Sequence, residues 1–163
     1  MKKITKIFAI AAILFSGLTM FNACNDDPCK DVNCGTNGTC DNGTCLCNTG
    51  YEGSACETLA TAKFIGNHNV SDTCSNTITY TSSISQNSTD ITKINIENFL
   101  GLGTGVIASA DVSGSTFTVP NGNSGVFSWM SVSGSINGTT TTINYTLNDG
   151  AASCTGVATY TRI

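Results

Sequence analysis

Hydrophobic and polar residues alternate in several segments after residue 62. In the segment 77–84, Ile78, Tyr80 and Ile84 fall on one face of an extended chain, while threonines and Ser83 fall on the other. The segments 93–97 and 142–147 repeat this pattern with isoleucine, tyrosine or leucine at every second position. A period of two residues is typical of β-strands with one buried face, so this part of the chain is predicted to be all-β.

Turn-forming residues separate these segments and set the expected number of strands. Examples are Pro120-Asn121-Gly122, Asn137-Gly138 and Asn148-Asp149-Gly150. The pattern predicts eight strands, at 63–71, 76–85, 91–98, 106–112, 115–119, 125–133, 139–148 and 153–162. Short connections favour hairpins, and an antiparallel meander of this size closes into an eight-stranded up-and-down barrel, with a β-sandwich as the alternative.

The first 23 residues have the pattern of a secretory signal peptide. Lys2, Lys3 and Lys6 form a basic start, and an apolar stretch follows that opens at Ile10 and closes at Phe21. About a dozen apolar residues are too few to cross a bilayer as a helix, which takes roughly 20. A signal peptide over residues 1–23, and therefore export, is the better interpretation.

Cys24 is the odd member of the nine cysteines, because six fall in one close motif and two lie in the later β-rich part. The segment Phe21-Asn22-Ala23-Cys24 resembles the lipobox of bacterial lipoproteins. This resemblance implies a lipid on Cys24 and a tether over residues 24–28, with an unpaired or dimer-forming thiol as the alternative. The acidic start that follows, Asp26-Asp27, resembles the signal that sends lipoproteins to the outward face of the bacterial outer membrane, and it also suits a solvated spacer.

Removal of residues 1–23 leaves an acidic protein. Four basic residues remain against eleven acidic ones, a net charge of −7; the basic residues are Lys30, Lys63, Lys93 and Arg162. Such a chain has little to attract phosphate groups, so binding to nucleic acid and a basic membrane-docking face are both excluded.

Six cysteines between residues 29 and 56 follow the spacing C-x4-C-x5-C-x4-C-x-C-x8-C. They are Cys29, Cys34, Cys40, Cys45, Cys47 and Cys56. An even set in so short an exported segment indicates a disulfide framework, since the segment cannot bury enough apolar surface to fold without cross-links. Spacing alone leaves all 15 pairings of six cysteines open.

The residues around these cysteines resemble an epidermal growth factor (EGF)-like domain. The segment 45–56 has one residue between two cysteines, the pair Gly50-Tyr51 and a second glycine at Gly53, and Asn37-Gly38 precedes Cys40. The resemblance implies an EGF-like domain over residues 29–57, followed by a linker over 58–62. It also implies three disulfides, Cys29 with Cys40, Cys34 with Cys45, and Cys47 with Cys56.

Some EGF-like domains bind calcium just before the first cysteine. Here Asp26 and Asp27 supply acidic groups, but Pro28 replaces the usual Glu or Gln, and four residues without an aromatic separate Cys40 from Cys45. Calcium takes six to eight oxygen ligands, and this segment supplies too few, so we expect no cofactor. Asp26 and Asp27 are the residues to test as calcium ligands.

The two remaining cysteines, Cys74 and Cys154, lie just after the first predicted strand and at the start of the last. Those strands are neighbours in a closed barrel, so we expect a fourth disulfide, with two free thiols as the alternative. This placement and the segment 63–68, which carries Gly66-Asn67-His68, resemble the lipocalin-like domains of exported bacterial lipoproteins. The resemblance implies a lipocalin-like domain over residues 63–163.

The residues that catalysis usually needs are missing from the sequence. His68 is the single histidine, so a second imidazole for a metal site is absent, and the glycine-rich segment 101–105 lacks the lysine of a phosphate loop. Phe127 and Trp129 share one face of their strand, with Val126, Met130 and Val132 on the other. We therefore expect that this protein is not an enzyme. Three residues have two possible roles, in the core or facing a ligand: Trp129, Phe127 and His68.

Two functions remain. The first is a lipid-anchored cell-surface binding or adhesion protein without catalytic activity, whose partner is a protein or a glycan. The second is a carrier that holds a small apolar ligand inside a lipocalin-like barrel. A void of several hundred Å3 in the barrel would favour the carrier, and a filled interior with an exposed aromatic patch would favour adhesion. The residues expected to line the interior are Phe64, Ile78, Tyr80, Ile94, Ile96, Phe117, Tyr145 and Tyr160.

Overall fold

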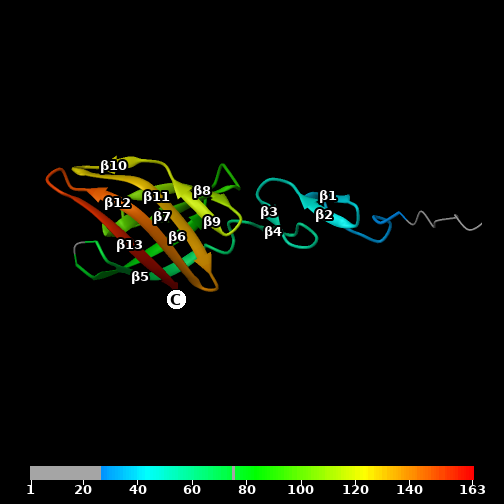
Figure 1. Cartoon of the computed structure of the whole chain (residues 1–163), viewed down its shortest axis with the longest axis horizontal. Coiled ribbons are helices and arrows are strands. Elements are labelled where there is room, and N and C mark those ends of the chain that lie inside the picture. The colour runs from blue at the N-terminus through cyan, green and yellow to red at the C-terminus, as the bar shows by residue number, and fades with distance from the viewer. Residues whose placement is uncertain (1–26, 75) are drawn as a thin grey trace, which may run out of the picture.

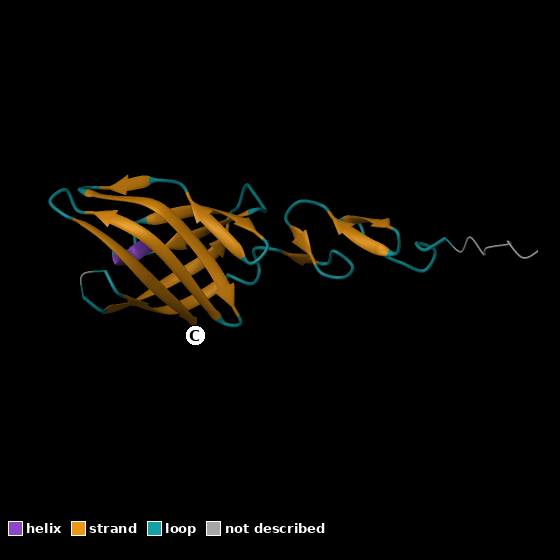
Figure 2. Ribbon diagram, viewed as in Figure 1, coloured by secondary structure: helices purple, strands orange, loops and turns teal. Residues whose placement is uncertain are grey.

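The computed structural model describes residues 27–74 and 76–163. Two modules lie end to end along its longest axis (Figure 1). The smaller module comes first in the described chain, and the larger one follows. The smaller module is rich in loops, while the larger is a cylinder of crossing strands (Figure 2). Within the described residues, no helix has the length and apolarity that crossing a bilayer requires.

The small module is built from two short hairpin-like pairs and three disulfides. Strand β1 (Gly38–Asp41) pairs with β2 (Thr44–Cys47), and β3 (Tyr51–Glu52) pairs with β4 (Thr58–Leu59). Asn42 and Gly43, both at positive φ, form the two-residue turn between β1 and β2, as is common for an Asn-Gly pair in a hairpin. The disulfides are Cys29–Cys40, Cys34–Cys45 and Cys47–Cys56, the pairing that the EGF resemblance implies.

The larger module is a closed antiparallel barrel. Its eight ring strands are β5 (Gly66–Asp72), β6 (Ile78–Gln86), β7 (Lys93–Glu97), β8 (Ile107–Ser113), β9 (Thr116–Val119), β11 (Phe127–Asn137), β12 (Thr140–Asn148) and β13 (Ser153–Arg162). Each ring strand pairs with its neighbours in this order, β13 pairs with β5, and the 3-10 turn η1 (Phe99–Gly101) follows β7. The prediction of an eight-stranded up-and-down barrel is therefore confirmed, and the sandwich alternative is wrong.

The structure contains one short strand that the alternation does not predict. The short β10 (Gly122–Ser124) pairs with the first residues of β11, where the sequence predicts only a turn. The first ring strand begins at Gly66 instead of residue 63, because the amide of Phe64 bonds to the carbonyl of Thr61 in a turn. These differences leave the order and the number of the ring strands unchanged.

Side chains fill the inside of the barrel. The largest side chains with almost no exposure include Phe64, Phe99, Phe117, Ile94, Ile96, Ile143 and Tyr160. The rings of Phe64 and Phe117 meet edge to face with centroids 5.3 Å apart, and those of Phe99 and Trp129 do the same at 5.3 Å. Of the residues expected inside, Ile78 differs, since it lies at the first position of β6 and is 49% exposed.

A β-bulge in β11 reverses the side on which Val132 lies. The sequence predicts Val132 on the face opposite Trp129, yet both side chains are buried. The register between β11 and β12 shifts between Met130 and Ser133, and Ser131 has a φ of 54°. Because a bulge inserts one extra residue, inward-facing positions change from odd to even numbers along the strand, and the predicted side of Val132 is wrong.

Glycines stand directly across from large aromatic rings at three places in this sheet. The cross-strand pairs are Gly134 with Phe117, Gly156 with Tyr145, and Gly122 with Trp129. A Cβ atom at Gly134 would stand 2.1 Å from Cζ of Phe117, so the ring occupies the space that any other residue would need. The glycines therefore allow the rings to lie flat across the neighbouring strand.

The disulfide Cys74–Cys154 joins the end of β5 to the start of β13. Its two cysteines are 80 residues apart in sequence, and their strands are paired neighbours. In the chain-entropy model, closing a loop of this length stabilises the fold by roughly 4 kcal/mol. The cross-link thus fixes the first and last strands of the meander to each other.

Direct contacts join the two modules. Lys63 Nζ lies 2.6 Å from Glu52 Oε2 in the small module and donates a hydrogen bond of 3.1 Å to the carbonyl of Gly114 in the barrel. Gly50 lies against Ile91, because a Cβ atom there would be 3.1 Å from the Ile91 side chain. The same lysine therefore bridges the end of the EGF-like module and a barrel turn.

We predict that Gly134→Ala destabilises the barrel by about 1–3 kcal/mol, because the added methyl group must displace the buried Phe117 ring. Gly105→Ala is the matched control, since a Cβ atom there meets open space and its φ is not in the left-handed region. Denaturant unfolding of both variants measures the difference. Equal stability of the two variants would contradict the packing described here.

Candidate functional site

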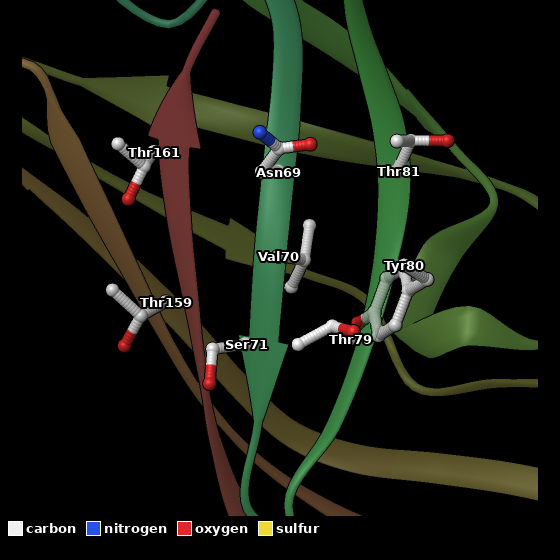
Figure 3. Close-up of a pocket in the computed structure, with 8 residues that line it drawn as sticks. All are labelled: Asn69, Val70, Ser71, Thr79, Tyr80, Thr81, Thr159 and Thr161. Atoms are coloured by element: carbon white, nitrogen blue, oxygen red, sulfur yellow. The ribbon is translucent and has the colours of Figure 1, made fainter.

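A hollow lies on the outer surface of the barrel, over β13, β5 and β6 (Figure 3). Its volume is about 510 Å3. The outward-facing residues that line it are Asn69, Ser71, Thr79, Thr81, Thr159 and Thr161, and together we call them the hydroxyl face. Val70 and Tyr80 also border the hollow, but Val70 is buried and Tyr80 is half-buried, because alternate residues of a strand point to opposite sides.

Strand register sets the hydroxyl face in rows. Ser71 pairs with Thr159 on one side and with Thr79 on the other. Asn69 pairs in the same way with Thr161 and Thr81. Adjacent strands lie about 4.8 Å apart, so each row presents polar groups at that spacing. The rows continue onto β12, because Thr142 pairs with Thr159 and Thr140 pairs with Thr161.

None of the six residues of the hydroxyl face carries a charge. Each threonine and serine hydroxyl on this face is able to donate one hydrogen bond and to accept others, and the side-chain amide of Asn69 has both a donor and an acceptor. A surface of this kind matches a neutral partner with many hydroxyl groups. It offers no counter-charge to an ionic ligand.

A second hollow of about 270 Å3 opens at the end of the barrel, where β5 ends and β13 begins. We call it the mouth pocket. Its apolar lining consists of Ile78, Leu100, Leu102, Phe127, Leu147 and the cysteines of the Cys74–Cys154 disulfide. Two carboxylates also line it, from Asp72, which is 1% exposed, and from Asp149, which is exposed.

The Asp72 carboxylate is held by three donors. The Tyr145 hydroxyl and the backbone N–H of Cys74, at 3.0 Å, donate to Oδ1, and the Tyr80 hydroxyl donates to Oδ2 at 3.2 Å. Burial, together with these interactions with Asp72, raises the pKa of both tyrosines above the usual value. Both hydroxyls therefore keep their protons at physiological pH and act as donors to the carboxylate.

The three residues expected to face a ligand lie in different surroundings. Trp129 is 7% exposed and packs in the core, where its indole N–H donates to the carbonyl of Pro120 at 3.1 Å, which agrees with the core alternative for this residue. His68 is 1% exposed and packs against Tyr160 inside the barrel. Phe127 is half-buried and lines the mouth pocket. The structure therefore brings only Phe127 of the three into either hollow.

His68 is an unusual residue for a barrel interior. Burial, and to a smaller extent the positive charge of Arg162, lowers its pKa below the ordinary 6.5. Its Nδ1 atom has no hydrogen-bond partner among the described residues. The imidazole is therefore neutral at physiological pH and serves as a packing group.

The lipidation and calcium predictions fall mostly on residues outside the described chain. Cys24 and Asp26 both precede the described residues. Asp27 Oδ1 accepts a hydrogen bond of 2.9 Å from the backbone N–H of Cys29, so this carboxylate caps the first turn of the module. Within residues 27–74 and 76–163, no group of three or more potential metal ligands comes together.

Sequence reasoning did not identify Asp72 or the hydroxyl face as a site. Asp72 is the last of four inward positions in β5, after Gly66, His68 and Val70. The alternation of residues in this segment therefore already places a carboxylate on the inward side of the strand, and this is the sequence signal that could have identified Asp72. The hydroxyl face depends on register between β13 and β5, which are the last and first strands of the barrel. A closed barrel predicts that these strands pair, but the register that aligns Ser71 with Thr159 is known only from the structure.

Comparison with known families assigns the small module. Residues 29–58 match the family model of the teneurin-like EGF domain. This segment is therefore an EGF-like domain, with three disulfides. No curated protein and no solved structure matches the chain.

We predict that stability falls as the pH drops below about 6.5. The lowered pKa of His68 means that the unfolded chain takes up a proton more readily than the folded protein, so the stability present above the unfolded value is lost on acidification. The thermal midpoint of the wild type should decrease between about pH 7.5 and 5.5, a range in which carboxylates barely titrate.

His68→Gln is the matched variant, because it removes the single titrating imidazole and keeps a neutral polar side chain. Its thermal midpoint should change much less over the same range. A wild-type midpoint that is constant between the two pH values, or an equal slope in the variant, would contradict the role assigned to His68.

Proposed function

We propose that this protein is a lipid-anchored cell-surface binding protein without catalytic activity, and that its hydroxyl face binds a neutral glycan. The observation that carries the proposal is the hollow of about 510 Å3 over β13, β5 and β6, which is lined by the uncharged side chains of the hydroxyl face. The proposal includes a signal peptide over residues 1–23, a lipid on Cys24 and an outward-facing position on the bacterial outer membrane.

The arrangement of the modules supports presentation of the barrel to a partner. The described chain begins at the end of the EGF-like domain that lies away from the barrel (Figure 1). Its three disulfides and the contact of Lys63 with Glu52 stiffen this connection. A lipid at Cys24 would then attach one end of the molecule to the membrane, with the barrel at the other end.

The chemistry of the hydroxyl face supports a glycan over a charged polymer. Sugar hydroxyls both donate and accept hydrogen bonds, as do the side chains of Ser71, Thr79 and Thr159. A net charge of −7 after residue 23 would repel acidic polymers. Each hydrogen bond to such an exposed surface contributes only about 1 kcal/mol, so many copies on one cell are needed for firm attachment.

The filled interior favours this function over a lipocalin-like carrier. Phe64, Phe117 and Tyr160 are almost fully buried and occupy the space that an internal ligand would need. Adhesion is also expected to show an exposed aromatic patch. Among the described residues, however, the large exposed apolar side chains are all aliphatic or methionine, so no such patch is present there. Hydroxyl groups therefore replace aromatic stacking as the proposed means of sugar recognition.

The glycan proposal is tested by removing hydroxyl groups without changing side-chain shape. Thr79→Val with Thr159→Val takes two hydroxyls from one row, and we expect binding to the neutral polysaccharide dextran to weaken about tenfold, the loss of one to two hydrogen bonds. Thr118→Val with Thr155→Val is the control, since both threonines are exposed on strands β9 and β13 outside the hollow.

Affinity electrophoresis in dextran and in dextran sulfate gives the readout. Retardation by dextran alone, lost in the first variant and kept in the control, supports the proposal. Absence of retardation across a panel of neutral glucans, mannans and xylans, or equal loss in both variants, would overturn it.

The anchor is tested separately. Cys24→Ala should release the protein into the soluble fraction, because the acyl chains that bury methylene groups in the bilayer are then absent. Intact mass of the mature wild-type protein should show a lipid on Cys24, and protease treatment of whole cells should remove the barrel. A soluble wild-type protein without lipid would refute this part of the proposal.

A further inference from the structure

The mouth pocket combines an apolar wall with a buried charge. Leu100, Leu102, Phe127 and Leu147 form the apolar lining. Asp72, at 1% exposure, lies at the inner end, while Ile78 and Asp149 lie at the exposed rim. A site of this kind suits a ligand that is apolar over most of its surface and polar at one end.

The Asp72 carboxylate keeps capacity for one more donor. A carboxylate accepts about four hydrogen bonds, and Asp72 receives three, from Tyr145, the Cys74 amide and Tyr80. Two of these reach Oδ1 and one reaches Oδ2, so Oδ2 has an unused lone pair. All three donors are uncharged, and the negative charge of the group is therefore not neutralised by them.

The basic residues of the described chain lie elsewhere. Lys63 pairs with Glu52, and Lys93 pairs with Asp111. Arg162, at the far end of β13, donates to the carbonyl of Lys63. Lys30 belongs to the EGF-like domain, and none of the residues lining the mouth pocket is basic. Two carboxylates therefore face this pocket without a cation from the described residues.

The carboxylate at the rim adds to the negative potential. Asp149 accepts hydrogen bonds from the backbone N–H groups of Ala151 and Ala152, at 2.9 and 2.7 Å. These bonds hold the pKa of Asp149 below its usual value. The rim thus stays ionised at neutral pH and favours the entry of positive charge.

We propose that the mouth pocket binds a small organic cation with an apolar body, such as an arylalkyl amine. Its ammonium group donates to the free lone pair of Asp72 Oδ2, and its aromatic part packs against Leu102, Phe127 and Leu147. A buried carboxylate gains more from an ionic donor than from a neutral one, so a charged amine is preferred over an alcohol of the same shape. This site is separate from the hydroxyl face and does not depend on glycan binding.

Three probes of one shape test the preference for charge. Phenethylammonium, 2-phenylethanol and phenylacetate are titrated into the full, isotope-labelled chain with its disulfides formed, and amide shifts are followed by NMR. We expect saturable shifts at Leu102 and Leu147, with phenethylammonium at least about tenfold tighter than 2-phenylethanol and no binding of phenylacetate. No saturable binding of phenethylammonium, equal affinity for the alcohol, or shifts centred outside the pocket would overturn the proposal.

Variants then separate the pocket from general electrostatics. Asp72→Asn should lower the affinity for phenethylammonium to that for the alcohol, but Asp72 also holds two tyrosine hydroxyls, and its replacement can disturb the fold. Ile78→Lys avoids this problem, because Ile78 is 49% exposed at the rim, and the added cation should weaken binding at least about fivefold.

Ile163→Lys is the matched control, since Ile163 is 69% exposed and follows β13 at the opposite end of the barrel from Ser153, which lines the pocket. It adds the same charge and should leave binding within about twofold of the wild type. Unchanged binding in Ile78→Lys, or an equal loss in Ile163→Lys, would overturn the assignment of the mouth pocket as the site.

Discussion

Closure of the barrel depends on the way in which one long strand, β11, changes partners. Its first residues pair with β10, and after the bulge at Ser131 its later residues pair with β9. The side chain of Asn121, between these two partners, accepts a hydrogen bond of 3.2 Å from the Ser131 amide. The pairing of β9 with β11 joins the two ends of the sheet, and this closure removes its exposed edges.

Much of this architecture could be predicted from the sequence. Alternation around Ile94, Ile96, Ile143 and Tyr145 identifies the strands and their buried faces, and all four side chains are buried. The bulge could not be predicted in this way, because the alternation through Trp129 and Val132 assumes an unbroken period of two, whereas an inserted residue depends on which strand lies opposite. The glycine across from Phe117 is also a consequence of register, not of local pattern.

The candidate sites were less predictable than the fold. His68 and Trp129 are the single histidine and the single tryptophan of the chain, which makes them candidate site residues in the sequence, yet both lie in the packed interior. The hydroxyl face consists of threonine, serine and asparagine, which are abundant throughout the sequence. The pairing of β13 with β5 is what aligns these residues in rows. Asp72 gains its importance from Tyr80 and Tyr145, which are near it only in three dimensions.

The cross-link between Cys74 and Cys154 is also part of the mouth-pocket wall. Its formation takes an oxidant, which the compartments outside the cytoplasm supply. The wall is therefore complete only after oxidation of the two thiols, and a reduced chain lacks one of the surfaces against which the proposed ligand packs. The same covalent bond that fastens the two ends of the meander thus makes the proposed ligand recognition depend on the oxidation state of these two cysteines.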